Sequence, residues 1–353
     1  MNSTRSALLR PCSRTLSTLI GIGLLLVPKI AFSQGCVPAH YVSLTLGAQG
    51  ISYLNPGQWE GDVSYRYLHS DRVFIGTEER PDLYNTGGRL TVNSFDLTAT
   101  YEVTYRFGLS LTMPFQHADY STIQGDGMRH TGSAGGLGDM RLLGTVWLFD
   151  PPSHPNGNIN IGVGVKAPTG DERAADDFHQ FGGTTILRPV DIAAQPGDGG
   201  WGFLLQLQAF QEIFKNLYGY ISGFYLFNPR DTNGTERPSP IVPMVNSVPD
   251  QYFGRIGLSY AVWPSKGLSI SLGCRADGIP VDDVIGDSNG FRRAGYSVYV
   301  DPGVNWVFGK NIFSLNVPVA VARAVEKTSN TYPPANAGAL ADFIIVVAFS
   351  RRF

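Results

Sequence analysis

Long hydrophobic runs, charged residues and cysteines are all scarce in this sequence. The longest apolar stretch, residues 16–27, is shorter than the ~20 apolar residues that one membrane-spanning helix needs. The mean hydropathy is only −0.04, so a bundle of membrane helices is excluded. Charged residues make up 16% of the chain, well below the roughly 25% of soluble domains. Their near balance, 27 basic against 29 acidic, argues against a nucleic-acid-binding surface.

Glycine and aromatic residues are abundant instead. The chain has 42 glycines, and aromatic residues make up 12% of it. Low charge together with many glycines and aromatics, but without long apolar runs, is typical of strands that alternate apolar and polar residues and turn one face to a membrane. Only three cysteines are present, and Cys36 and Cys274 are too far apart in sequence to indicate a disulfide scaffold.

Residues 1–33 have the features of a secretory signal peptide. They contain no acidic residue, and the apolar stretch 16–27 is followed by Pro28 and the small-residue motif Ala31-Phe32-Ser33. Cleavage there removes four cations, so a net charge of −2 becomes −6; the four are Arg5, Arg10, Arg14 and Lys29. A retained N-terminal anchor is the alternative, which the short apolar stretch disfavours. Cys36 lacks the upstream aliphatic residue that lipidation requires.

From about residue 58 to the C-terminus, apolar and polar residues alternate with a period of two. In the last stretch, Ile345, Val347 and Phe349 share one face, whereas Ala348 and Ser350 share the other. Glycine, proline, asparagine and aspartate separate the stretches, and this pattern predicts β-strands. The expected strands lie near residues 59–69, 93–106, 109–119, 138–150, 157–168, 201–213, 216–228, 251–263, 267–278, 294–308, 311–323 and 340–353.

The connections between these strands alternate between short and long. The short connections lie at 107–108, 151–156, 214–215, 264–266 and 309–310; the long ones cover roughly 70–92, 120–137, 169–200, 229–250, 279–293 and 324–339. An even number of strands with short turns at one end and long loops at the other is the topology of outer-membrane barrels. The sequence therefore predicts an all-β fold, a transmembrane antiparallel up-and-down β-barrel of about twelve strands over residues 58–353, with both termini on the periplasmic side.

A soluble β-sandwich also alternates apolar and polar residues. Three features favour the barrel: the strands approach the 9–11 residues that cross a membrane at a tilt, aromatic residues such as Tyr296 and Trp306 gather at the strand ends, and the chain ends on Phe353. A terminal phenylalanine resembles the signal read by the barrel-assembly machinery, although Arg351 occupies a usually apolar position. We expect an exported protein of the Gram-negative outer membrane, in contact with its lipid.

The polar faces of the strands should line the lumen. The charged residues expected there are Asp62, Arg66, Asp96, Glu102, Arg106, Asp139, Arg141, Lys166, Glu212, Arg255, Arg275, Asp277, Asp301 and Arg352. Both signs occur in similar numbers, whereas an ion-selective pore needs one sign. We expect ion pairs across a narrow, weakly selective path; the alternative is that these charges only stabilise the barrel.

Two segments are candidates to restrict the lumen. Residues 34–57 are expected either to plug it or to remain in the periplasm, and the 169–200 loop is long enough to fold inward as a constriction. That loop also carries Asp171, Glu172, Asp176, Asp177 and His179, which could offer oxygen ligands to a hard cation. Their spacing matches no calcium-loop template, so a solvated acidic loop is favoured and no metal site is predicted.

Catalysis has little support in the sequence. Some twelve-stranded barrels are lipases with a His and a Ser two residues apart on one strand. Here His69 and Ser70 are adjacent, and adjacent strand residues point to opposite faces. The chain contains no H-E-x-x-H or P-loop motif, and 135–139 lacks the strand and helix that a nucleotide loop requires. We expect no enzyme, no cofactor and no nucleic-acid partner.

Two short motifs carry a family resemblance. They are Gly136-Leu137-Gly138-Asp139-Met140-Arg141-Leu142, which opens a strand, and Leu54-Asn55-Pro56-Gly57-Gln58, which precedes the first one. Both resemble motifs of the outer-membrane barrel family related to the phenol meta-pathway degradation protein. The resemblance implies a channel or transporter for small organic solutes, often aromatic or hydrophobic, that pass passively through a polar lumen. The alternative function is a structural or surface-recognition barrel acting through its long extracellular loops.

Overall fold

The computed structural model describes residues 53–237, 244–328 and 337–353, and every structural statement below refers to these residues. The expected signal peptide and most of the expected plug segment 34–57 lie outside them. No helix in these three ranges is long and apolar enough to cross a membrane.

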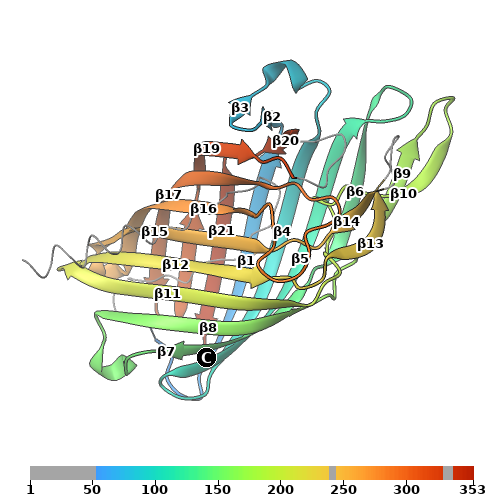
Figure 1. Cartoon of the computed structure of the whole chain (residues 1–353). Coiled ribbons are helices and arrows are strands. Elements are labelled where there is room, and N and C mark those ends of the chain that lie inside the picture. Colours follow the sequence, from blue (N-terminus) through green and yellow to red (C-terminus); the bar gives the residue numbers. More distant parts are fainter. Residues whose placement is uncertain (1–52, 238–243, 329–336) are drawn as a thin grey trace, which may run out of the picture. The chain divides into compact units, whose positions relative to one another are not determined.

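Within the described residues, twelve antiparallel strands close into a barrel (Figure 1). In order around the ring they are β1 (Trp59–Ser70), β4 (Arg89–Glu102), β5 (Phe107–Ile123), β6 (Arg129–Leu137) continued by β7 (Met140–Trp147), β8 (Gly157–Ala167), β11 (Gly202–Phe214), β12 (Leu217–Phe227), β15 (Gln251–Trp263), β16 (Leu268–Ile279), β17 (Gly295–Phe308), β18 (Asn311–Asn316) continued by β19 (Val319–Val325), and β21 (Ile344–Arg352). β21 pairs with β1 and closes the ring. The predicted fold class is confirmed.

Short turns and long loops occupy opposite ends of the barrel, as the sequence predicts (Figure 1). Among the described residues, the short-turn end carries two short 3₁₀ helices, η2 (Pro151–Ser153) and η3 (Pro264–Lys266). The long loops carry β2 (Arg72–Ile75), β3 (Glu78–Glu79), η1 (Pro81–Leu83), β9 (Ala175–His179), β10 (Thr185–Pro189), β13 (Thr232–Arg237), β14 (Met244–Ser247) and β20 (Ala337–Leu340). Because short turns are periplasmic in such barrels, the long loops form the extracellular end.

The period-two pattern determines which side chains face lipid. In β17, Val300, Val304 and Trp306 are exposed on the outer face, whereas Ser297 and Asp301 are buried in the interior. Aromatic pairs lie at the short-turn end of this outer face; the ring centroids of Trp306 and Phe308 are 4.6 Å apart. Exposed apolar side chains flanked by aromatic residues form the surface that a bilayer covers.

The first short turn differs from its predicted position. β4 ends at Glu102, and residues 103–106 form the turn before β5. The Thr104 hydroxyl accepts hydrogen bonds from the backbone N–H groups of Arg106 and Phe107, at 3.2 and 3.0 Å. This side-chain cap competes with continuation of the strand, so the turn begins four residues earlier than the alternation alone indicates.

Two wall strands are interrupted, each opposite a proline. The break between β6 and β7 lies at Gly138-Asp139, where Gly138 N–H donates to the Pro114 carbonyl at 2.7 Å. Pro114 has no N–H to return, so the ladder stops there. A Cβ on Gly138 would lie 3.1 Å from both Pro114 Cγ and the Pro196 carbonyl oxygen, which explains why glycine occupies this position. The break between β18 and β19 lies opposite Pro302 in the same way.

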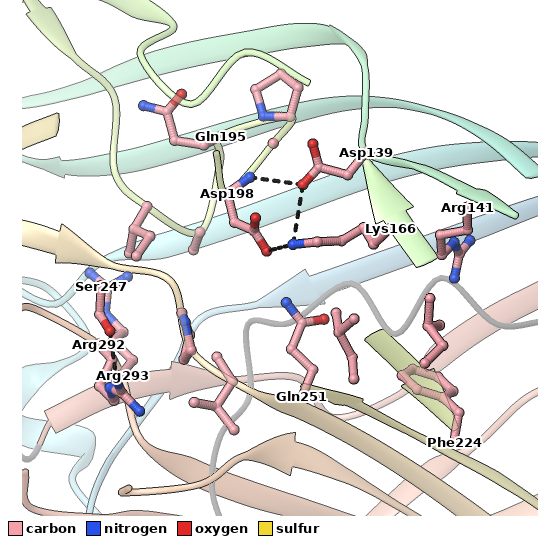
Figure 2. Close-up of a pocket in the computed structure, with 18 residues that line it drawn as sticks. Asp139, Arg141, Lys166, Gln195, Asp198, Phe224, Ser247, Gln251, Arg292 and Arg293 are labelled. Carbon is pink, nitrogen blue, oxygen red and sulfur yellow. Dashed lines mark hydrogen bonds and ion pairs between the residues drawn. The ribbon is translucent and has the colours of Figure 1, made fainter. Parts of the chain in front are cut away.

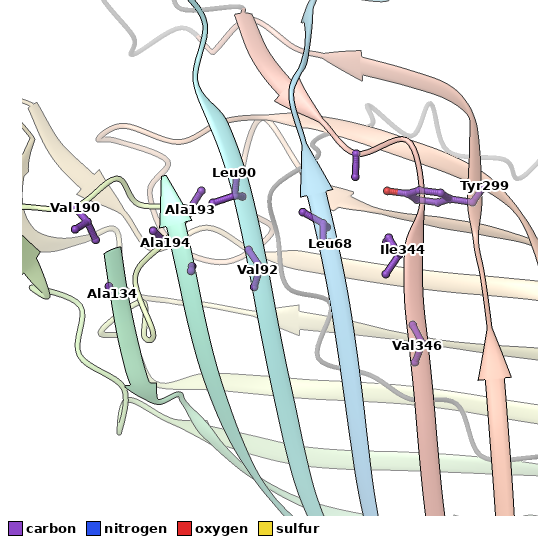
Figure 3. Close-up of a cluster of buried hydrophobic side chains, with 12 residues drawn as sticks. Leu68, Leu90, Val92, Ala134, Val190, Ala193, Ala194, Tyr299, Ile344 and Val346 are labelled. Carbon is purple, nitrogen blue, oxygen red and sulfur yellow. The ribbon is translucent and has the colours of Figure 1, made fainter. Parts of the chain in front are cut away.

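The loop between β10 and β11 folds into the barrel. Ala193 and Ala194 of this loop pack among inward-facing side chains of the wall strands, as Figure 3 shows. The buried members of this cluster are Leu68, Leu90, Val92, Ala118, Ala134, Val190, Ala193, Ala194, Tyr299, Ala341, Ile344 and Val346. The carboxamide of Gln116, on the inner face of β5, donates to the Gln195 carbonyl at 2.9 Å. The 169–200 loop therefore narrows the extracellular half of the lumen.

Candidate functional site

The charged positions expected in the lumen lie on inward-facing positions of the wall, with two qualifications. Arg106 lies in the turn 103–106, is exposed, and donates to the carbonyl oxygens of Trp147 and Leu148 at 2.8 Å, so its placement on the lumen wall is wrong. Glu212 lies at the periplasmic rim, where it accepts the N–H of Asn216 at 3.1 Å and supports the β11–β12 turn. Both residues stabilise turns.

Lys166 fastens the inward loop to the barrel wall. Its side chain on β8 is 3% exposed and its ammonium contacts the carboxylate of Asp198 and lies 3.6 Å from that of Asp139 (Figure 2). The Asp139 carboxylate also accepts the N–H groups of Gly170 and Asp198, at 3.0 and 3.1 Å. The strand break at Asp139 thus supplies an anion that binds both ends of the loop.

A second set of charges continues along the wall from Lys166. Arg141 of β7 lies 3.3 Å from Asp96 of β4, and the Arg66 guanidinium on β1 donates to Ser94 at 2.9 Å. Arg66 and Asp96 are both buried, each residue being 6% exposed. Asp96 thus offsets the charge of Arg141 across the intervening strand β5.

The opposite wall carries its own ion pairs. Arg275 lies 3.6 Å from Asp277 on β16, and Arg255 of β15 lies 3.6 Å from Asp301 of β17. At the periplasmic rim, Arg352 binds Glu60 at 2.7 Å. The Arg275–Asp277 pair lies within one strand, whereas the other two pairs join different strands.

The remaining two predicted carboxylates lie near the periplasmic end of the barrel. Asp62 on β1 accepts the hydroxyl of Ser350 at 2.7 Å. Glu102, the last residue of β4, is buried. Its carboxylate lies against Gly108, where an added Cβ would be 2.8 Å from Oε2. Together with Glu60, these two carboxylates give the β1–β4 side of this mouth an acidic lining.

A cavity lies between the inward loop and the wall formed by β8, β11 and β12. Its volume is about 110 Å³, and its two sides differ in character. Leu204, Phe224 and Leu226 give an apolar wall, and Lys166 with Gln251 give polar groups on the facing surfaces (Figure 2). An amphiphilic cavity of this kind suits a small molecule with an apolar body and a polar group.

A second apolar group lines the same side of the barrel at its periplasmic end. Its buried members are Trp147, Phe210, Tyr218 and Tyr220, with Tyr53 packed against them. A belt of buried polar side chains separates it from the cavity; the belt consists of Asn160, Gln206, Gln208 and Ser222. The lumen on this side therefore alternates apolar, polar and aromatic surfaces along its length.

Sequence reasoning missed the residues that give the lumen its apolar surfaces. Phe210, Phe224 and Trp147 are in phase with the polar positions of their strands, for example Phe210 with Gln206 and Gln208. An aromatic residue on the otherwise polar face of a barrel strand is the signal that would have identified them. Asp198 and Tyr53 carry no such periodic signal because they lie outside the strands.

The acidic cluster of the 169–200 loop makes structural hydrogen bonds. Asp176 accepts the N–H of Ser133 at 2.8 Å, and Asp171 accepts that of Arg173 at 2.8 Å. Among the described residues, no group of three or more histidine, cysteine, aspartate or glutamate side chains is placed to hold a metal ion.

No hydrolase geometry is formed by the described histidines and serines that the sequence singles out. Ser70 is buried and His69 is partly exposed on the opposite face of β1, as expected. The segment 286–290 matches the pattern G-x-S-x-G. It lies in a loop rather than a strand-to-helix turn, and the Ser288 hydroxyl accepts the N–H of Asp283 at 2.8 Å.

Comparison with solved structures places the fold among outer-membrane barrels. The chain is similar to an outer membrane channel from Pseudomonas putida F1, with a TM-score of 0.60 and 17% identity over 89% of this chain and 100% of that one. Two further structures are less similar. The β-domain of the Bordetella autotransporter BrkA has a TM-score of 0.48 and 12% identity over 84% of this chain and 100% of that one. The Ralstonia pickettii toluene transporter TbuX has a TM-score of 0.46 and 12% identity over 92% of this chain and 96% of that one. No protein-family model and no curated protein matches the sequence.

A closed, lipid-facing antiparallel barrel of this topology is an outer-membrane β-barrel protein. The similarity at 17% identity extends to the fold.

Proposed function

We propose that this protein is an outer-membrane channel for passive passage of small organic solutes with an apolar or aromatic body. The observation that carries the proposal is the two-sided cavity between the inward loop and the β8–β11–β12 wall. The similar Pseudomonas putida barrel, described as an outer membrane channel, supports it.

The lining explains how such a solute is accepted without being trapped. Phe224 and Leu204 present a small apolar surface, and the polar belt at Gln206 follows within two residues along β11. A solute that leaves the apolar wall enters a polar zone before it meets the aromatic residues of the periplasmic end. Several weak sites in series permit both entry and release, which conduction requires.

The arrangement of charges in the lumen supports passage of organic solutes rather than selection of ions. Arg141 pairs with Asp96, and Arg255 pairs with Asp301, so neighbouring groups of opposite sign cancel. A channel that selects ions needs a ring of one sign. Paired charges instead hold the wall and the inward loop in place and leave the apolar surfaces to choose the solute.

The test compares two sulfonates of equal charge in proteoliposomes that contain the purified protein. We expect benzenesulfonate to enter faster than methanesulfonate, and Phe224→Gln to reduce benzenesulfonate entry. Phe203→Gln, the same substitution at an outward-facing position of the neighbouring strand β11, is the matched control and should leave entry unchanged. Absence of benzenesulfonate entry above that of protein-free liposomes would refute the channel function.

A surface-recognition barrel is the second candidate, and the β9–β10 hairpin favours it. Phe181 at its tip is 92% exposed and Leu187 is 72% exposed. Deleting the tip 180–184 would abolish a surface-binding phenotype and leave sulfonate entry unchanged if recognition were the function. If the protein is only a channel, the same deletion should change neither sulfonate entry nor surface binding.

A further inference from the structure

An aromatic side chain from outside the wall strands packs against the inner wall at the periplasmic end of the barrel. Tyr53 precedes β1, and its ring packs against two inward-facing aromatic residues of the wall, Trp147 of β7 and Phe210 of β11. The ring centroid of Tyr53 lies 4.9 Å from that of Trp147 at an interplanar angle of 77°, and 6.1 Å from that of Phe210. Both distances lie in the range that aromatic pairs favour, and the Tyr53–Trp147 pair has edge-to-face geometry.

The Tyr53 hydroxyl also has a specific partner. It donates a hydrogen bond to the backbone carbonyl of His154 at 2.6 Å, in the short turn between β7 and β8. The wall therefore offers two aromatic faces and one carbonyl acceptor. We call Trp147, Phe210 and the His154 carbonyl the aromatic box.

The aromatic box is not required by the barrel as such. Trp147 and Phe210 occupy inward positions, which are polar in water-filled barrels, and each is less than 10% exposed because Tyr53 and its neighbours cover it. The Tyr53 segment is held separately from the box: the Arg352 guanidinium donates to the Tyr53 carbonyl at 3.1 Å, and Gly57 N–H donates to the Glu102 carbonyl at 2.7 Å. These contacts are made by the backbone and do not involve the Tyr53 ring.

We propose that the aromatic box is a binding site for a neutral aromatic solute bearing one hydroxyl donor, and that the Tyr53 side chain occupies it as an intramolecular stand-in. The proposal rests on the channel function, because it names the solute class at the periplasmic exit. A phenol reproduces each contact of the Tyr53 ring: edge-to-face packing on Trp147, contact with Phe210 and a hydrogen bond to the His154 carbonyl.

The experiment empties the box and refills it with the missing side chain. The probe is p-cresol, which has the ring, hydroxyl and methyl carbon of a tyrosine side chain, and the readout is tryptophan fluorescence of a full-length chain in which Trp147 is the single remaining tryptophan. We expect Tyr53→Ala to bind p-cresol saturably, since apolar cavities opened by truncation take up small aromatics. If the ring fills the box in about nine-tenths of molecules, removing it tightens apparent p-cresol binding ~10-fold.

Three controls isolate the box. Tyr105→Ala removes an exposed tyrosine from the neighbouring periplasmic turn and should bind p-cresol as weakly as the unsubstituted chain. Tyr53→Phe keeps a ring in the box and should bind equally weakly. In the Tyr53→Ala chain, cyclohexanol tests the need for an aromatic ring and toluene tests the need for the hydroxyl; both should bind less tightly than p-cresol.

Equal p-cresol affinity in Tyr53→Ala and the unsubstituted chain would overturn the proposal, as would cyclohexanol binding as tightly as p-cresol. If Tyr53→Ala does not fold, 3-fluorotyrosine at position 53 replaces it: saturating p-cresol should shift the fluorine resonance, and an unchanged resonance overturns the proposal. Failure of the channel function is separate, since it is measured as absent benzenesulfonate entry into proteoliposomes whatever p-cresol does.

Discussion

Removal of the Lys166 charge tests whether the inward loop is held by electrostatics. Lys166→Met keeps the length and apolar stem of the side chain but leaves the carboxylates of Asp139 and Asp198 without their cation. At 3.6 Å and an effective dielectric constant of about 20, one such charge pair is worth about 5 kcal/mol. Breaking a buried pair by deleting one partner costs about 3–5 kcal/mol, so we expect docking of segment 190–200 to weaken by about this amount.

Two measurements report the docking directly. Backbone amides of segment 190–200 should exchange hydrogen faster in Lys166→Met, because a lower opening free energy raises the open population. Single-channel current in planar bilayers should rise, since Ala193 and Ala194 narrow the lumen in the docked state. Asp198→Asn in the same chain removes one stranded carboxylate and should restore part of the protection.

Lys215→Met is the matched control, because Lys215 lies in the short β11–β12 turn and is exposed. It should change neither exchange nor current. Unchanged exchange and unchanged current in Lys166→Met would refute the reasoning, and would indicate that the apolar contacts of the loop alone hold it in the barrel.

Three further predictions follow from the register, from a loop ion pair and from the box. Val347→Arg should hinder assembly by about 2–4 kcal/mol, because Val347 faces lipid in mid-strand. Ala348 points inward, so Ala348→Arg should give more folded barrel in heat-modifiability gels. Equal amounts of folded barrel for the two variants would contradict the register. Arg292→Met should lower urea stability by about 3–5 kcal/mol, since Arg292 and Asp283 form a fully buried pair at 2.6 Å; unchanged stability would contradict this. Burial raises the pKa of the Tyr53 phenol, so docking of its ring should persist through neutral pH and be lost as pH rises through that raised value; Trp147 emission that changed at neutral pH would contradict this.

The wall of the barrel could be predicted from the sequence because its physics is local. A strand between lipid and a polar interior must alternate, so the inward and outward positions of β17 and β21 follow from the period-two pattern alone. The short and long connections then determine which end faces the periplasm. The prediction fails at 103–106, where one hydroxyl, that of Thr104, caps a turn inside a stretch that still alternates.

The interior of the barrel could not be predicted in the same way. The contact between Lys166 and Asp198 joins a wall strand to a loop 32 residues away, and no periodicity relates the two. The same holds for Tyr53 and Trp147, which come from a segment before β1 and from the end of β7. Such contacts depend on how a loop or terminus folds back, which the alternation does not constrain.

The charged and the aromatic residues of the lumen have different roles. Charges placed there by the polar strand faces are largely taken up by their neighbours, as with Arg275 and Asp277, or hold the loop, as with Lys166. A paired charge has little left to offer a passing solute, because its partner already screens it. The surfaces still able to discriminate are the apolar wall at Phe224 and the aromatic box at Trp147, and both lie on the β7–β12 side of the barrel. Selection by this channel should therefore depend more on aromatic surface than on solute charge, and substitutions at Phe224 should change solute preference more than substitutions at Arg275.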